Sequence, residues 1–153
     1  MTKNEEIIRE LYRTAEVKDV DAFVALFTKD GYFWDVSAGQ RYFGADIGKT
    51  VEIYATAFKD MHRELGNFYV AGDVVIAELT LNGTHTGPLA LSVGTIPPTA
   101  KKMHAPCCDV FHLKDGKICL PHQRVKGRHA SQRSGDSGGC MVVGQDRAPR
   151  LVR

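Results

Sequence analysis

The spacing of hydrophobic residues changes once along the chain and separates a helical part from a strand-forming part. Before Lys59, apolar residues recur mostly at helical spacing. The first such segment follows a capping-box pattern at residues 2–5, and two later segments open at Asp19 and Gly44. A short aromatic strand is predicted over residues 32–36, between the second and third segments. We therefore predict three helices in the N-terminal part.

From His62 onward, apolar and polar residues alternate, as they do in strands with one buried face. Residues 62–70 and 74–84 are predicted to form two strands joined by a Gly-Asp turn. Residues 83–118 predict two strands joined by a Pro-containing crossing, followed by an Asp-Gly turn that opens a third strand. Three helices followed by antiparallel strands predict an α+β fold with the helices on one face of the sheet.

Length and composition are typical of one globular domain, since the chain has 153 residues, of which 43% are hydrophobic and 25% charged. No apolar run approaches the roughly 18 residues of a membrane span, and the polar N-terminus does not resemble a signal peptide. We expect a cytoplasmic protein with no membrane partner. The four cysteines lack zinc-ligand spacing and are expected to be free thiols.

Basic residues gather at the C-terminal end. Residues 1–123 hold 13 Lys and Arg against 16 Asp and Glu, whereas residues 124–153 hold seven against two. The basic segment lacks interleaved aromatic residues, so no nucleic-acid binding is expected. We predict a single domain over residues 1–126 and a loosely held tail over 127–153. The sequence GDSGG at 135–139 matches a serine-protease motif by its letters, but the chain is too short for that fold.

Three motifs resemble those of a known family. GTHTG at 83–87, IPPT-x-K at 96–101 and D-V-F-x-x-x-D-G-K-I at 109–118 recur in this order in SnoaL-like polyketide cyclases and ketosteroid isomerase-like proteins. These proteins belong to the nuclear transport factor 2-like superfamily. The resemblance implies a curved antiparallel sheet that wraps three N-terminal helices into a cone, with a ligand at its mouth. It also implies a homodimer through the outer sheet face, where Cys108 and Val110 lie beside His112.

Asp35 is the first candidate for catalysis. It follows Trp34, and apolar neighbours would raise the pKa of its carboxyl towards the range that suits a general base near neutrality. Residues 18–35 also resemble the segment of ketosteroid isomerases whose last Asp shuttles the proton. The alternative is a surface Asp in a turn, accepting backbone N–H bonds near Ser37.

Asp109 and His85 are the next candidates. Alternation places Asp109 on one strand face with apolar residues. The resemblance implies that Asp109 stays protonated and donates a hydrogen bond to a substrate oxyanion. The alternative is a buried Asp that ties down a neighbouring loop. His85, within GTHTG, has the parity of the apolar face of its strand and is expected to reach the pocket.

Aromatic residues and histidines complete the expected site. The isomerases use a Tyr on the first helix, but alignment places Leu11 there, with Tyr12 about 100° away around the helix. This departure argues against true steroid isomerisation. The histidines lack metal-ligand spacing, so no metal is expected, and each could instead be an ordinary strand or loop residue. The expected ligand-binding residues are Tyr12, Trp34, Phe58, His62, His104, Phe111 and His122.

These observations predict a cofactor-free acid–base enzyme of isomerase, cyclase or hydratase type. Its substrate would be a small, mostly apolar carbonyl compound. Asp35 would abstract a proton next to the carbonyl, and Asp109 or His85 would stabilise the enolate oxygen. The alternative is a non-catalytic module of the same fold that binds a small ligand or mediates dimerisation.

Overall fold

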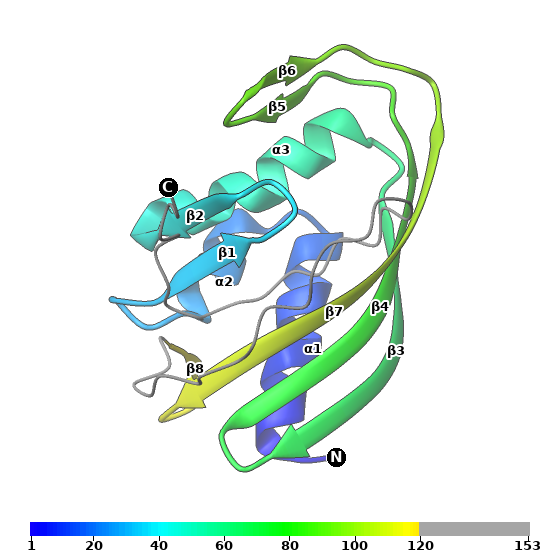
Figure 1. Ribbon diagram of the computed structural model, residues 1–153. Helices are drawn as coiled ribbons and strands as arrows, with labels where there is room; N and C mark the ends of the chain where they lie inside the picture. Colours follow the sequence, from blue (N-terminus) through cyan, green and yellow to red (C-terminus); the bar gives the residue numbers. More distant parts are fainter. Residues whose placement is uncertain (120–153) are drawn as a thin grey trace, which may run out of the picture.

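A long curved sheet and a layer of helices on its concave face make up the molecule (Figure 1). The computed structural model describes residues 1–119, so the expected tail, His122 and Cys140 lie outside the described residues. The helices are α1 (Lys3–Glu16), α2 (Val20–Ala25), the 3-10 helix η1 (Gly44–Gly48) and α3 (Lys49–Ala57). The main sheet is antiparallel in the order β3 (His62–Ala71), β4 (Val74–Thr84), β7 (Lys102–Lys114) and β8 (Lys117–Ile118). Two separate hairpins are β1 (Tyr32–Asp35) with β2 (Gln40–Phe43), and β5 (Leu89–Leu91) with β6 (Gly94–Ile96). The predicted α+β class is confirmed.

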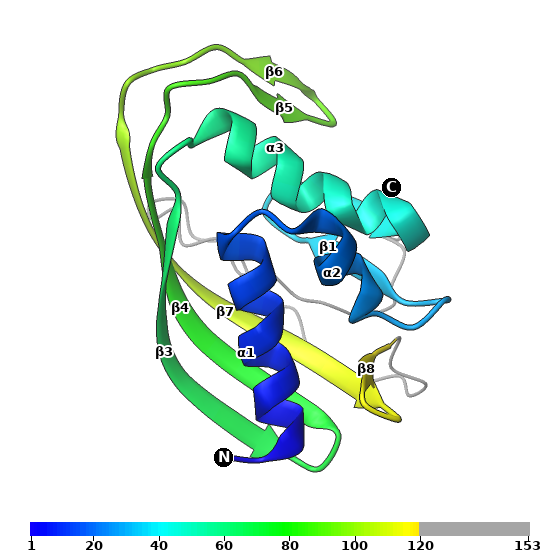
Figure 2. The same cartoon turned by 180° about the vertical axis from the view of Figure 1, so that it is seen from behind.

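The first two helices begin at the predicted caps. The Thr2 hydroxyl accepts a hydrogen bond from the Glu5 amide at 3.2 Å, and the Asp19 carboxylate accepts one from the Ala22 amide at 3.0 Å. α1 then lies across the concave face of the sheet (Figure 2) and buries its apolar stripe there. That stripe consists of Ile8, Leu11, Tyr12 and Ala15.

The predicted third helix is divided in two. Residues 44–48 form η1, and the α-helix begins at Lys49. Neither segment has a side-chain cap, and Gly44 has a positive φ of 54°. Gly48 lies so close to α2 that a Cβ there would overlap Val20. The tight 3-10 turn therefore packs η1 against α2 before the regular helix starts.

The β3–β4 hairpin turns at Gly72, which has a positive φ of 61°, as predicted. A β-bulge between Leu65 and Phe68 was not predicted. Because a bulge adds one residue to one strand, it reverses the parity of the side chains that follow. Leu65 and Phe68 consequently both pack against the core, although three residues separate them.

The two faces of the sheet follow the predicted alternation on β4. Val75, Ala77, Leu79 and Leu81 are buried against the helices. We call the opposite side the outer face; it carries the cross-strand pairs Ile76–Val110 and Glu78–Cys108 and the half-exposed Tyr69 that pairs with Ile76.

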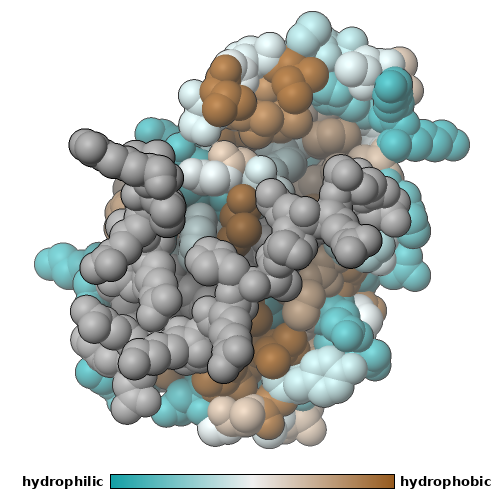
Figure 3. Space-filling view, viewed as in Figure 1, coloured by the Kyte–Doolittle hydropathy of each residue, from teal (hydrophilic) through white to brown (hydrophobic). Residues whose placement is uncertain are grey.

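The Pro-containing crossing between β4 and β7 contains the small hairpin β5–β6, which was not predicted. The amides of Thr86 and Gly87 both donate to the Ala57 carbonyl at the end of α3, each at 3.0 Å. A Cβ on Gly87 would overlap the Thr56 carbonyl oxygen, so only glycine permits this close approach. Apolar side chains gather over the hairpin in Figure 3, in line with the exposure of Val93.

None of the helices within residues 1–119 is long and apolar enough to cross a membrane.

Candidate active site

A cavity of about 40 Å³ lies between the helices and the concave face of the sheet. Its wall is mostly apolar, and its polar side chains come from four elements. They are Tyr12 of α1, Thr50 and Tyr54 of α3, Arg63 of β3 and Asp109 of β7. Of the residues expected at a ligand site, this cavity brings together Tyr12, Asp109 and Phe111.

Asp109 and Tyr12 form a buried hydrogen-bonded pair in this wall. The Tyr12 hydroxyl donates to Asp109 Oδ2 at 2.7 Å, and Asp109 is only 3% exposed. Asp109 Oδ1 is also buried and has no hydrogen-bond partner among the described residues. Burial raises the pKa of Asp109 to about 7, the charge of Asp35 adds to that increase, and Tyr12 and Arg63 oppose it. Asp109 can therefore gain and lose a proton near neutral pH.

The pKa of Tyr12 moves in the same direction as that of Asp109. Burial raises it well above its ordinary value, and the neighbouring charge of Asp109 raises it further. Tyr12 is therefore a neutral donor that holds one carboxyl oxygen in place. Its ring lies edge-on to Phe68 and Phe111, with centroid distances of 6.4 and 6.0 Å. Tyr12 lies one residue after the helix position that corresponds to the isomerase Tyr, but its hydroxyl still reaches Asp109.

Asp35 is buried at the end of β1 and its carboxyl oxygens are occupied. It is 1% exposed, and one oxygen accepts from Ser37 Oγ at 2.7 Å and from the Ala38 amide at 2.9 Å. The other accepts from the Tyr54 hydroxyl at 2.7 Å. Burial, followed by the charge of Asp35, raises the pKa of Tyr54. Asp35 therefore accepts the turn hydrogen bonds expected of a surface Asp. It is nevertheless buried, as expected of a carboxyl with apolar neighbours.

Asp35 contacts the cavity indirectly. Tyr54 lines the cavity and donates to Asp35, whereas Asp35 itself is not part of the cavity wall. Two Tyr–Asp pairs, Tyr12–Asp109 and Tyr54–Asp35, thus place their hydroxyl groups near one small space.

His85, Phe58 and Trp34 lie outside the cavity wall. His85 is buried, its Nδ1 is 3.0 Å from Thr99 Oγ1, and its ring lies on Phe58 with a centroid distance of 5.2 Å. This cluster connects the loop after β4 to the end of α3. Trp34 lies under the Arg41 guanidinium, with 4.5 Å between the Arg41 Cζ and the ring centroid.

His62 and His104 lie on the surface. His62 Nδ1 is 2.7 Å from Glu16 Oε1, and His104 Nδ1 is 2.8 Å from Asn82 Oδ1. Both side chains are exposed, and neither lines the cavity. In the part of the chain that the structure describes, no group of three or more His, Cys, Asp or Glu side chains is placed to hold a metal ion.

Arg63 and Tyr54 are the site residues that sequence reasoning missed. The Arg63 side chain is 13% exposed, and burial lowers the pKa of its guanidinium. The sequence did contain an indication for Arg63. Arg63 and Leu65 are two residues apart on β3 and so share a strand face, and Leu65 packs against the core, which places the Arg63 cation on the buried face. Helical spacing alone places Tyr54 with the apolar residues of α3, and no sequence pattern indicates that its hydroxyl reaches Asp35.

Comparisons with known proteins agree on this architecture. The family model of the SnoaL-like domain matches residues 8–120. No curated protein matches the sequence. Many solved structures are similar. One is a protein from Catenulispora acidiphila with a ketosteroid isomerase-like fold, solved with trimethylamine, at 19% identity and a TM-score of 0.62; the match covers 74% of this chain and 79% of that one.

Two other similar structures cover more of the chain. A protein from Jannaschia sp. CCS1, described as a SnoaL-like polyketide cyclase, has 16% identity and a TM-score of 0.65 over 92% of this chain and 83% of its own. SalBIII, an epoxide hydrolase/cyclase-like enzyme described for pyran ring formation in salinomycin, has 23% identity and a TM-score of 0.61 over 93% and 89%. At these identities the similarity shows the fold alone.

Proposed function

Because the chain belongs to the SnoaL-like domain family, we propose that it is an acid–base enzyme of isomerase, cyclase or hydratase type acting on a small carbonyl compound. The observation that carries this proposal is Asp109, a buried cavity-lining carboxyl with one unpartnered oxygen and a pKa of about 7. A general base works best when its pKa is near the working pH. Similar folds with cyclase and epoxide hydrolase/cyclase-like names support the enzymatic interpretation.

We assign the proton transfer to Asp109 rather than to Asp35. Oδ1 of ionised Asp109 takes a proton from the carbon next to the substrate carbonyl, and the bonding electrons move onto the carbonyl oxygen. Tyr12 keeps Oδ2 in position throughout. The protonated Asp109 then returns the proton to a different atom, which completes an isomerisation. Alternatively, the enolate carbon attacks a second carbonyl of the substrate and closes a ring, and the alkoxide that forms takes the proton back from Asp109. Asp35 has no oxygen left for a direct role, because three donors occupy its carboxylate.

The test uses proton NMR to monitor the exchange of α-protons in D₂O, with 2-butanone and 2-oxobutanoate as probes. The wild-type protein should accelerate exchange of at least one probe over buffer, and the rate should rise with pH through about 7, since the ionised carboxyl is the base. Asp109→Asn should lower the rate by roughly 10²–10⁴. Glu64→Gln, on an exposed position of β3, is the matched control. Equal rates for Asp109→Asn and wild type would refute the assignment.

A second candidate is a ligand-binding module without turnover. The observation that favours it concerns Asp35, the expected base. Both of its carboxyl oxygens already accept hydrogen bonds from within the protein. In that case Asp109→Asn would change the affinity for a ligand, while neither probe would exchange faster than in buffer.

A further inference from the structure

The hydroxyl groups of the cavity have no proton left for a ligand. A hydroxyl has one proton to donate. Tyr12 donates to Asp109 and Tyr54 donates to Asp35, each at 2.7 Å. Thr50 donates to a backbone carbonyl oxygen in η1 at 2.8 Å. A ligand with acceptor groups must therefore find its donors elsewhere in the wall.

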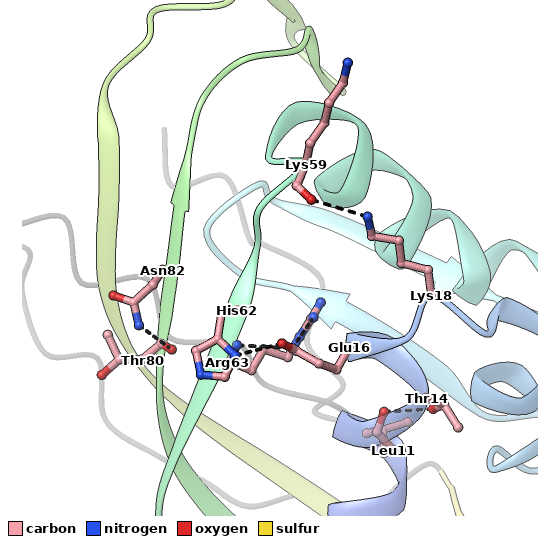
Figure 4. Close-up of polar contacts among 9 residues, drawn as sticks. All are labelled: Leu11, Thr14, Glu16, Lys18, Lys59, His62, Arg63, Thr80 and Asn82. Atoms are coloured by element: carbon pink, nitrogen blue, oxygen red, sulfur yellow. Dashed lines mark hydrogen bonds and ion pairs between the residues drawn. The ribbon is translucent and has the colours of Figure 1, made fainter.

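Arg63 has unused donors. A guanidinium carries five N–H groups, and within residues 1–119 its one hydrogen bond runs from Nη1 to Glu16 Oε2 at 3.4 Å. Charge-assisted bonds of this kind are usually about 2.7–2.9 Å long, so this contact is weak. Figure 4 shows that the Glu16 carboxylate also contacts His62, at 2.7 Å, and it accepts the Arg63 amide at 3.2 Å.

This arrangement leaves a cation incompletely paired in a mostly apolar wall. The Arg63 side chain is 13% exposed and shares the cavity with Asp109. An apolar ligand would remove water from the guanidinium without replacing its hydrogen bonds, which is unfavourable. A carboxylate would replace them, because its two oxygens match the planar fork of arginine.

We propose that Arg63 binds a carboxylate of the ligand, so that the substrate is a short-chain oxo acid rather than a neutral carbonyl compound. The oxo group in this proposal rests on the proposed function; the carboxylate rests on Arg63 alone. Arg63 comes from β3 and Asp109 from β7, and both flank β4. A ligand anchored at Arg63 can therefore present its carbonyl end towards Asp109.

The experiment measures binding by isothermal titration calorimetry with two matched pairs of probes. The pairs are 2-oxobutanoate with 2-butanone, and 4-oxopentanoate with 2-pentanone. At least one oxo acid should bind wild type roughly 10- to 100-fold more tightly than its ketone, the range expected for hydrogen bonds to a charged group. Arg63→Gln should remove that preference by weakening oxo-acid binding to the level of the matched ketone. Arg9→Gln is the control, since Arg9 forms another Arg–Glu pair, with Glu5 at 2.8 Å, outside the cavity.

A second variant separates ligand binding from a purely structural role and keeps the test valid if Arg63→Gln does not fold. Glu16→Gln leaves the guanidinium in place but removes its competing charge, so the preferred oxo acid should bind more tightly than to wild type, by a few-fold. If Glu16→Gln weakens oxo-acid binding, if folded Arg63→Gln keeps the preference, or if wild type binds neither oxo acid, the proposal is overturned.

Failure of this proposal is distinguishable from failure of the proposed function, because binding and exchange are measured separately. Oxo-acid binding through Arg63 without α-proton exchange keeps the carboxylate site and rejects the acid–base enzyme. If 2-butanone exchanges in a way that depends on Asp109 but oxo acids are not preferred, the acid–base enzyme is kept and the carboxylate site is rejected.

Discussion

Asp109→Asn should stabilise the protein at alkaline pH even though it removes the proposed proton-transfer group. Burial raises the pKa of Asp109 from its ordinary value of 3.8 to about 7. Between these two values the folded protein holds a proton that the unfolded chain has lost. Stability therefore falls as pH rises through this window. The contribution of Asp109 is fully present below pH 3.8 and is lost above about pH 7.

The size of the effect follows from the separation of the two pKa values. Each pH unit of separation corresponds to about 1.4 kcal/mol, so the whole window corresponds to about 4 kcal/mol. Between pH 5 and pH 8, the wild-type protein should lose about 2.5 kcal/mol of this contribution. An Asn at 109 is neutral at both pH values and still offers an oxygen to Tyr12. The NH₂ group of the Asn occupies the site of Oδ1, where the described part of the chain offers no hydrogen-bond partner. A buried polar group without a partner costs about 1–3 kcal/mol of stability.

We therefore expect the variant to be about as stable as wild type at pH 5 and about 1–3 kcal/mol more stable at pH 8. Urea unfolding measures this, with fluorescence of the single tryptophan, Trp34, as the signal. The quantity to compare is the difference in free energy of unfolding between the two proteins at each pH, because all other titrating groups are shared. Glu64→Gln should follow the wild-type pH dependence. Parallel pH dependences for Asp109→Asn and wild type, or a less stable variant at pH 8, would refute the reasoning.

Four other outcomes are expected. Asp35→Asn should destabilise the fold by about 1–3 kcal/mol, because an amide must then face a donor such as the Tyr54 hydroxyl; an unchanged urea midpoint would contradict this. Gly87→Ala should cost at least about 1 kcal/mol through its overlap with the Thr56 carbonyl, and unaltered thermal melting would argue against it. We propose that the protein is a homodimer through the apolar part of the outer face, which light scattering at micromolar concentration checks; a monomer would end this proposal. Deletion of residues 130–153 should leave melting and ligand binding nearly unchanged, whereas aggregation or a much lower melting temperature would show that the tail belongs to the fold.

Elements set by local chemistry were predictable from the sequence. The caps at Thr2 and Asp19 lie within three residues of the amides they satisfy, so the starts of α1 and α2 could be predicted. The faces of β4 follow from the alternation of a strand, since buried and less buried residues alternate over 74–81. The hairpin β5–β6 has only three residues in each strand, too few for a periodic pattern to appear.

The pairings within the site were beyond the sequence because they join distant positions. Tyr12 and Asp109 are 97 residues apart. Alignment put Leu11 at the site and Tyr12 elsewhere, but α1 buries both, with 1% and 6% exposure. An apolar stripe on a helix spans 100° or more, so two adjacent residues can both reach the interior. The helix rotation that decides this depends on packing against β3 and β4, which periodicity does not specify.

The two Tyr–Asp pairs show why chemistry should be sought at Asp109. Both carboxyls are almost fully buried and each accepts a tyrosine hydroxyl at 2.7 Å. Asp35 receives two further donors from its own turn, the Ser37 hydroxyl and the Ala38 amide. Asp109 receives none among the described residues, so its charge is costly and its proton is mobile near neutral pH. A second donor, placed at Asp109 Oδ1, would make the fold more stable at pH 8 and would also remove the free oxygen that a base requires. The unsatisfied atom and the atom proposed to take the proton are therefore the same, which is the relation expected where a fold gives up stability for function.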